Sequence, residues 1–416
     1  MTVVVIGAGV VGVTLAYELA LSGERVTVVD AAGGAADETS FANGSLITPS
    51  MSDPWASPGV PSMVLKYLGR EEAPFLLRLG ALREMAGWGV SFLRNCSASK
   101  WRQNTMAVFP LAEYSRDRVD AMTVELGLDY DRSDVGTMRI HSDEASMRAA
   151  ESSLDVFREL GCDVRTLGQE ECLAMEPALR PVASDVYGGY HFPGDRSGDC
   201  RMFTRDIAAR ARKLGVEFLF NTRVTGVEME AGQVKSAITA SGSIEAKRFV
   251  MAAGSYSAGL ARQAGIRIPV YPVKGYSATF DVAGWNLAPS VPFVDNSRKI
   301  GVVRLGQRLR IAGTAEFSGF DTSDNPVRTG LLLKHFRALF PQSEGVGPAQ
   351  YWHGLRPASP DGRPYIGRTP VPNLFVNTGH GPLGWTLASG SARALADTMC
   401  GLVPDIDLGP FALGRP

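Results

Sequence analysis

Cysteine is scarce and scattered in this chain of 416 residues. Its five cysteines, Cys96, Cys162, Cys172, Cys200 and Cys400, are odd in number and include no C-x-x-C pair. This pattern argues against a disulfide framework, a cysteine zinc site and a cysteine-bound iron–sulfur cluster. We therefore predict free thiols in a reducing compartment, a cytoplasmic location and no bound metal.

The sequence also lacks a strong net charge, because acidic and basic residues are interspersed and sum to −1. We therefore expect no basic surface of the kind that binds nucleic acid. No stretch is long and apolar enough to span a bilayer, and the apolar residues 1–21 lack the basic start of a signal peptide. A chain of this length with 45% hydrophobic residues can bury a large core, and it predicts two domains.

Residues 61–95 qualify the cytoplasmic prediction, because apolar residues recur there at helical spacing among Arg and Lys. Such a segment suits a helix lying on a membrane surface, or an amphipathic helix pair covering a core. We favour the helix pair and keep peripheral contact with the inner membrane as the alternative. Oligomer formation stays open.

The first 30 residues have the pattern of a dinucleotide-binding βαβ unit. A β-branched run at residues 2–6 predicts a strand, Gly7, Gly9 and Gly12 supply a G-x-G-x-x-G spacing, and residues 10–22 predict a helix. The glycines of this fingerprint form a tight turn, let the backbone approach a pyrophosphate, and let the helix pack closely on the strand. The helix N-terminus then favours the negative charge of the phosphates.

Asp30 directly follows the second predicted strand of this unit, residues 25–29. A carboxylate at this position accepts hydrogen bonds from both ribose hydroxyls and disfavours a 2′-phosphate. The N-terminal unit therefore predicts FAD or NAD rather than NADP, and by itself leaves the first two open.

Further along the chain the pattern changes twice. Residues 204–257 predict a helix, a hairpin and a strand that runs into small residues. Residues 270–314 alternate with period two, which is typical of an antiparallel meander with one buried face. The other predicted elements are helices at 111–126, 146–160 and 328–340 and a strand at 136–141.

Five ordered motifs behind the N-terminal unit resemble the family of FAD-dependent D-amino acid oxidases and glycine/sarcosine oxidases. They are ETSFANGSLI (38–47), MAAGSYS (251–257), YPVKGYS (271–277), GLRPASPDGRPYIG (354–367) and GHGPLGWTLASG (379–390). The resemblance covers essentially the whole chain. It implies an α/β (α+β) fold, with a Rossmann-like FAD-binding domain and an inserted antiparallel-sheet substrate domain. We expect the FAD-binding domain at 1–85, 194–269 and 353–416, and the substrate-binding domain at 86–193 and 270–352.

The resemblance decides for FAD as the cofactor. It implies that the N-terminal unit holds the ADP half, that the backbone of Val224 reaches the adenine, and that the 38–47 loop passes the pyrophosphate and flavin. A helix starting near Leu383 would direct its free amides at the flavin pyrimidine edge, where they stabilise the negative charge of the reduced state. The expected cofactor-binding residues are Gly7, Ala8, Gly9, Val10, Val11, Gly12, Asp30, Thr39, Ser40, Asn43, Gly44, Ser45, Val224, Ala253, Gly254, Gly379, His380, Gly381, Leu383, Gly384, Trp385 and Thr386.

Arg356 matches the arginine that grips the substrate carboxylate in this family. A guanidinium suits that role because it donates two parallel hydrogen bonds to a planar carboxylate. Tyr276 and Tyr271 lie on a strand expected to roof the flavin, and His353 is a further catalytic candidate. Two more residues are expected near the substrate, Lys274 and Arg304.

The resemblance implies oxidative deamination of a D-amino acid to a 2-oxo acid and ammonia. The Cα hydride would pass to flavin N5 from a substrate with a neutral amine, whose lone pair makes a side-chain base dispensable. Electrons would then pass to a quinone or another acceptor. The alternatives are an oxidase or dehydrogenase of the glycine/sarcosine or D-proline/hydroxyproline type, and a flavin subunit of an electron-transfer assembly. The preferred side chain and the acceptor stay open.

Overall fold

The parallel sheet expected from the N-terminal unit is present in the computed structural model, which describes residues 2–67, 69–343 and 345–415. The sheet has six strands in the order β19-β20-β13-β1-β2-β9, and its neighbours run parallel except for β19 and β20. The strands are β1 (Thr2–Ile6), β2 (Arg25–Val29), β9 (Glu217–Leu219), β13 (Arg248–Met251), β19 (Tyr365–Arg368) and β20 (Leu374–Thr378). The strands predicted at 2–6 and 25–29 are confirmed.

Alternate side chains of β1 enter two different hydrophobic cores. Val3 and Val5 pack with helices on one face of the sheet, and Val4 and Ile6 pack on the opposite face. Because side chains alternate along a strand, a continuous β-branched run serves both faces. The helices of the first face are α1 (Val10–Leu21), α7 (Cys200–Lys213) and α10 (Gly384–Met399); the second face carries β10 (Val224–Glu230), β11 (Gln233–Thr239), β12 (Gly242–Glu245) and α8 (Ser257–Gln263).

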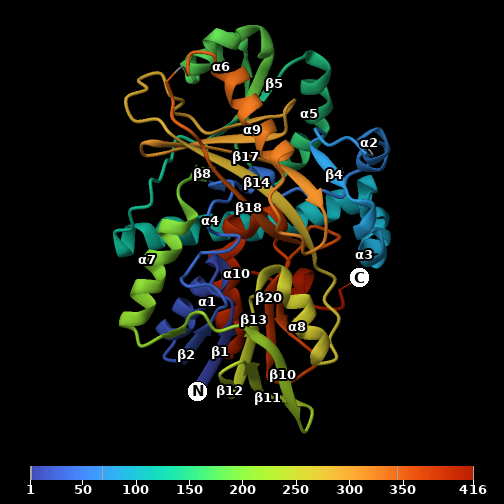
Figure 1. Cartoon of the computed structure of the whole chain (residues 1–416), viewed down its shortest axis with the longest axis vertical. Coiled ribbons are helices and arrows are strands. Elements are labelled where there is room, and N and C mark those ends of the chain that lie inside the picture. The colour runs from blue at the N-terminus through green and yellow to red at the C-terminus, as the bar shows by residue number, and fades with distance from the viewer. Residues whose placement is uncertain (1, 68, 344, 416) are drawn as a thin grey trace.

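A nine-stranded sheet forms the other half of the molecule (Figure 1). Its order is β18-β14-β17-β16-β15-β5-β7-β6, and β4 pairs in addition with β17. The meander predicted at 270–314 is confirmed in β14, β16 and β17, which pair antiparallel. The strands are β4 (Phe75–Leu77), β5 (Thr137–His141), β6 (Arg165–Gly168), β7 (Gly188–Phe192), β14 (Tyr271–Asp281), β15 (Phe293–Asp295), β16 (Ile300–Leu305), β17 (Arg308–Phe317) and β18 (Gln350–Ala358).

Helix α9 (Pro326–Leu339) covers one face of this sheet. The rings of Phe280 on β14 and Phe336 on α9 stack with centroids 3.9 Å apart, and α6 (Gln169–Met175) extends the same core. Helix α5 (Glu144–Glu159) packs separately, through Leu154, on β7. The opposite face of β14, β17 and β18 is left to meet the six-stranded half.

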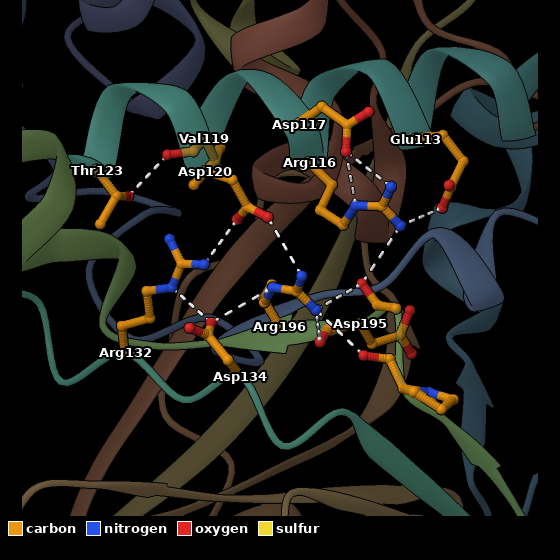
Figure 2. Close-up of polar contacts among 12 residues, drawn as sticks. Glu113, Arg116, Asp117, Val119, Asp120, Thr123, Arg132, Asp134, Asp195 and Arg196 are labelled. Atoms are coloured by element: carbon orange, nitrogen blue, oxygen red, sulfur yellow. Dashed lines mark hydrogen bonds and ion pairs between the residues drawn. The ribbon is translucent and has the colours of Figure 1, made fainter. Parts of the chain in front are cut away.

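A network of ion pairs and hydrogen bonds around Arg196 connects the two halves (Figure 2). Arg196 belongs to β8 (Arg196–Ser197), which pairs with β3 (Leu46–Ile47). Arg196 pairs with Asp120, on helix α4 (Ala98–Leu126), at 3.3 Å and with Asp134 at 3.3 Å. It also donates to the backbone carbonyls of the turn that follows β7. The network therefore holds one helix and one turn in a fixed relation at the junction.

Two predicted segments differ in detail from the structure. Residues 61–95 contain the expected helices, α2 (Val60–Tyr67) and α3 (Leu82–Asn95), with the short strand β4 between them; position 68 lies outside the described residues. The helix predicted from 111 begins thirteen residues earlier, because the Ser97 side chain caps its N-terminus by accepting a hydrogen bond from the Lys100 amide. Pro110 is accommodated inside this helix on an exposed position.

The domain limits predicted from the sequence also differ from the sheet and core membership. β4 falls inside the range 1–85, yet it pairs with β17 of the nine-stranded sheet. Helix α4 falls inside the range 86–193, yet its buried residues Val108, Leu111 and Val119 join the core of the six-stranded half. Both differences arise from contacts between segments that are distant in sequence.

Among the described helices, none has an apolar stretch long enough to cross a membrane. Across the described residues, no group of three or more His, Cys, Asp or Glu side chains is placed to hold a metal ion.

Candidate functional site

A long cleft runs along the carboxyl ends of β1, β2, β13 and β20 and continues under the nine-stranded sheet. It encloses about 1480 Å³ of empty space, open solvent at its mouth included. The predicted residues that line it are Gly7, Gly9, Val10, Val11, Asp30, Thr39, Ser40, Asn43, Gly44, Val224, Ala253, Gly254, Tyr276, Arg356, His380, Gly381, Gly384 and Trp385.

Two glycines of the N-terminal turn, Gly7 and Gly12, leave no room for side chains. A Cβ on Gly7, whose φ is +115°, would lie 2.4 Å from the Ala252 carbonyl oxygen. A Cβ on Gly12 would lie 2.0 Å from the carbonyl oxygen of Gly7. Helix α1 begins directly behind this turn, and its Val10 amide donates to the Ser40 hydroxyl at 3.0 Å. The turn therefore presents backbone amides at a helix N-terminus, as a pyrophosphate site requires.

Asp30 lies at the end of β2, on the side of the cleft that Val224 lines. Its carboxylate accepts hydrogen bonds from the amides of Ala8 at 2.5 Å and Ala32 at 2.7 Å. These bonds fix the carboxylate at the end of the strand, where a ribose would lie. Neighbouring lining residues that the sequence analysis missed are Ala31, Glu38, Thr222, Arg223, Tyr256 and Leu260.

The loop at 38–45 connects the two halves across the cleft. Thr39 donates to the Leu355 carbonyl at 3.0 Å, and Ser277 donates to the Ala42 carbonyl at 2.7 Å. Ser45 points away from the cleft, and its hydroxyl accepts a hydrogen bond from Arg310 at 2.8 Å. The loop residues thus hold the roof strands as well as facing the cleft.

The C-terminal turn brings a helix N-terminus to the cleft. A short 3-10 helix, Gly381–Leu383, leads into α10 at Gly384, close to the predicted start. His380 is buried, and burial lowers its pKa to about 3, so the imidazole is neutral. Its Nε2 lies 3.3 Å from the Ser391 hydroxyl.

Two buried polar side chains of the cleft wall have no hydrogen-bond partner in the described part of the chain. They are the Trp385 indole, through Nε1, and the Asn377 amide, through both Oδ1 and Nδ2. Unsatisfied buried groups are costly in a folded protein, so they indicate a bound ligand that completes them. Asn377 was not among the predicted residues, although it is the last but one residue of β20, just before the predicted GHG turn.

Arg356 on β18 faces the cleft beneath the roof, opposite Val273 of β14. Its Nη1 donates to the Thr314 carbonyl at 2.9 Å, and its Cζ lies 5.7 Å from the Trp55 ring centroid. Burial lowers its pKa to about 10, which leaves it a cation at neutral pH. Within the described residues no carboxylate lies within 4.0 Å of it. A half-buried cation without a counter-ion among the described residues is suited to receive an anionic ligand.

The other catalytic candidates do not present their functional groups to the cleft. Tyr276 lines the cleft, but its ring belongs to the core under α9 and its hydroxyl donates to Glu316. The Tyr271 hydroxyl accepts from the Gly319 amide at 2.9 Å. His353 lies 3.3 Å from Asp324 through Nδ1.

The remaining predicted residues have structural contacts. Lys274 donates to the Ser323 carbonyl, and Arg304 donates to the Gly306 carbonyl at 3.0 Å. Thr386 accepts from the Thr48 amide at 3.1 Å. The predicted cofactor residues that do not line the cleft are Ala8, Gly12, Ser45, Gly379, Leu383 and Thr386.

The flat roof over the cleft is made by small residues that the sequence analysis did not select. Gly275 of β14 pairs with Gly354 of β18, and Ala312 of β17 lies beside them in the lining. Trp352 closes this wall. The two glycines are far apart in the sequence. Their common position in the roof can be recognised only when the pairing of β14 with β18 is known.

Comparison with known families and proteins agrees with this geometry. The model of the DAO family of FAD-dependent oxidoreductases matches residues 2–398. A D-amino acid dehydrogenase of Bradyrhizobium diazoefficiens is 40% identical over 415 residues, covering 100% of this chain and 99% of the relative. A D-amino acid dehydrogenase of Dechloromonas aromatica is 44% identical over 416 residues, with 99% of each chain covered.

Solved structures share the fold at low sequence identity. L-proline dehydrogenase from P. horikoshii superposes with a TM-score of 0.79 at 18% identity, covering 100% of this chain and 97% of that one. Glycine oxidase from Geobacillus kaustophilus gives 0.77 at 23% identity, covering 100% and 98%. With the family model spanning nearly the whole chain, FAD is the cofactor, and the chain belongs to the DAO family of FAD-dependent oxidoreductases.

Proposed function

We propose that this chain catalyses the FAD-dependent oxidative deamination of D-amino acids to 2-oxo acids and ammonia, and acts as a dehydrogenase. The observation that carries the proposal is Arg356, a half-buried cation that faces the cofactor cleft without a carboxylate partner in the described residues. The D configuration of the substrate is supported by the relatives at 40% and 44% identity, which are named D-amino acid dehydrogenases.

The residues of the cleft fit FAD. The turn at Gly7 and Gly12 admits only backbone, Asp30 ends β2 at the ribose position, and Asn377 and Trp385 offer unpaired polar groups. When bound, FAD supplies the acceptor for the hydride that leaves Cα. The N-terminus of α10 adds a positive dipole at the far end of the cleft.

Arg356 binds and orients the substrate. Its guanidinium donates parallel hydrogen bonds to the substrate carboxylate, and the Trp55 ring covers the guanidinium. The Thr314 carbonyl takes one N–H and so fixes the plane of the group. A carboxylate held in this way places Cα at a constant position in the cleft, which lowers the entropic barrier to reaction.

No protein base is part of the proposal. His380 is neutral but enclosed beside Ser391, and the Tyr276 hydroxyl is engaged with Glu316. We propose that the substrate binds with its amine deprotonated, so that the nitrogen lone pair assists departure of the hydride. We therefore assign Tyr276, Tyr271 and His353 to supporting the roof.

The proposed electron acceptor is a quinone, in keeping with the word dehydrogenase in the names of the relatives. The test is anaerobic titration of the purified yellow holoprotein with matched D- and L-amino acids, followed by addition of a soluble quinone or of oxygen. Bleaching by D-enantiomers only, with reoxidation faster by quinone than by oxygen, is expected. Bleaching by L-enantiomers, or by none, would contradict the substrate assignment, and rapid peroxide formation in air would make the chain an oxidase.

A further inference from the structure

A second, smaller cavity lies beside the cofactor cleft. Its walls come from the 53–56 segment, helix α3 and the turn before α10. Three aromatic rings, those of Trp55, Trp88 and Phe92, form its apolar surface, and Asp53 and Ser359 are polar groups in its lining. We call this cavity the side chamber.

The side chamber adjoins the position proposed for the substrate carboxylate. Gly381 and Pro382 line both the cleft and the chamber. The Trp55 ring, one wall of the chamber, lies 5.7 Å from the Arg356 guanidinium. In an α-amino acid the carboxylate and the side chain leave the same carbon. When Arg356 holds the carboxylate of a substrate, the first atoms of the substrate's side chain therefore lie within a few bonds of the chamber.

Among the described residues, the polar groups of the chamber have no side-chain hydrogen-bond partner. Ser359 is 6% exposed, and its hydroxyl has no hydrogen-bond partner in the described part of the chain. Asp53 is half-buried, and burial raises the pKa of its carboxyl, against the opposing charges of Arg139 and Lys299. In the described part of the chain, no other side chain forms a hydrogen bond or ion pair with the Asp53 carboxylate. Buried polar groups without hydrogen-bond partners are stabilised by a ligand that completes their hydrogen bonds.

Resting on the proposed function, we infer that the side chamber receives the substrate's side chain, and that Asp53 discriminates by charge. Side chains that end in a carboxylate are disfavoured there, because they would meet a like charge in a partly desolvated site. Side chains that end in a hydrogen-bond donor or a cation are favoured, since they satisfy Asp53 and Ser359. The aromatic walls contact the apolar stem of the side chain.

The kinetic test compares D-glutamine with D-glutamate, which differ in charge at nearly constant shape, and D-lysine with D-norleucine. We expect the wild type to favour D-glutamine over D-glutamate, and D-lysine over D-norleucine, by at least about tenfold in kcat/KM. Asp53→Asn should shrink both ratios about tenfold while D-alanine is still oxidised. Glu84→Gln, which removes an exposed acid from α3, is the matched control and should leave both ratios unchanged.

A binding measurement removes the dependence on turnover. 2-Oxopentanoate and 2-oxoglutarate have the same chain length and differ by one carboxylate, and tryptophan fluorescence reports their binding. The wild type should bind 2-oxopentanoate more tightly, and Asp53→Asn should bring the two dissociation constants together. If Asp53→Asn does not fold, Ser359→Leu, which fills the chamber, should depress the oxidation of D-glutamine and D-lysine far more than that of D-alanine.

The two proposals fail in different ways. If no D-amino acid bleaches the flavin of the wild type, the proposed function is wrong. If D-alanine is oxidised by every variant but Asp53→Asn leaves both substrate ratios and both dissociation constants unchanged, the chamber is not the side-chain subsite.

Discussion

The guanidinium of Arg356 lies in the space that a side chain at Gly275 would fill. A Cβ on Gly275 would come within 2.3 Å of the Arg356 Cζ, across the pair of antiparallel strands β14 and β18. The absence of a side chain at one position is therefore what allows the cation at the other to lie flat against the roof of the cleft. The same glycine is paired with Gly354, so the roof is flat at this point.

Gly275→Ala should displace Arg356 without disturbing the sheet, because the obstructed atoms belong to the end of a flexible side chain. We expect KM for D-alanine to rise by about tenfold to a hundredfold, the worth of a charge-assisted pair of hydrogen bonds. FAD content and thermal stability should stay near the wild type. Gly301→Ala on β16 is the control, because its Cβ would make only ordinary contacts, with Leu46 Cδ1 at 3.6 Å and the Ala312 carbonyl oxygen at 3.9 Å. An unchanged KM in Gly275→Ala would show that Arg356 does not hold the carboxylate.

Gly12→Ala should lower the stability of the fold, whereas Gly9→Ala should lower the affinity for FAD. A Cβ at Gly12 would lie 2.0 Å from a backbone oxygen, which cannot move aside, so the variant should lose several degrees of thermal stability even without FAD. A Cβ at Gly9 would meet only the Ser40 hydroxyl, at 3.4 Å. Gly9→Ala should therefore fold, but bind FAD at least about tenfold more weakly, because its backbone faces the pyrophosphate. Thermal denaturation of the apoproteins and fluorescence titration with FAD separate the two effects.

The N-terminal unit could be predicted because its signals are local. The strand, the glycine turn, the helix and Asp30 follow one another within 30 residues, and each forms as expected. Arg356 was identified by its motif and does face the cleft. These residues could be identified from local sequence and the order of the motifs, without knowing how distant segments pair.

The roof could not be predicted in the same detail, because it depends on pairing over long distances. An irregularity in the β14–β17 register between Lys274 and Tyr276 affects which side chains face the cleft, and Tyr276 turns into the core under α9. The strand β4 is three residues long and is defined only by its partner β17. Asn377 was not predicted, because an asparagine near a strand end indicates a ligand contact only when the residues around it in the cleft are known.

Asn377→Leu should separate apoprotein stability from cofactor affinity. The Asn377 amide is buried and has no partner among the described residues, so a leucine of similar size should leave the apoprotein as stable or more stable. FAD binding should weaken, because the ligand loses a donor and an acceptor. Denaturant unfolding of the apoprotein and FAD titration are the two measurements.

Asn373, four residues earlier, is the matched control for this prediction. Its side chain is also buried, but it accepts from the Val234 amide at 2.9 Å and donates to the carbonyls of Val234 and Lys247. Asn373→Leu should therefore destabilise the apoprotein by about 1–3 kcal/mol, because it leaves buried backbone groups unpaired. Equal losses of stability in both variants would contradict the assignment of Asn377 to the cofactor.

Asp195 should make the stability of the protein depend on pH at the junction between the two halves. It belongs to the turn held by the ion-pair network of Figure 2, and its carboxylate accepts hydrogen bonds from the hydroxyls of Ser50 at 2.6 Å and Thr137 at 2.5 Å. Burial raises its pKa from 3.8 to about 6. The folded protein therefore holds this proton more tightly than the unfolded chain does. As a result, the contribution of Asp195 to stability is largest below pH 4 and is lost as the pH rises to about 6.

The measurement is denaturant unfolding of the wild type and Asp195→Asn at intervals from pH 4 to pH 7. The amide does not titrate, so the wild type should lose up to roughly 3 kcal/mol relative to the variant between pH 4 and pH 6, and nothing further above that. Asp117→Asn, at the exposed end of the same network, controls for the change in net charge and should give a flat difference. If the difference in free energy of unfolding between the wild type and Asp195→Asn also stays constant with pH, this carboxyl keeps an ordinary pKa.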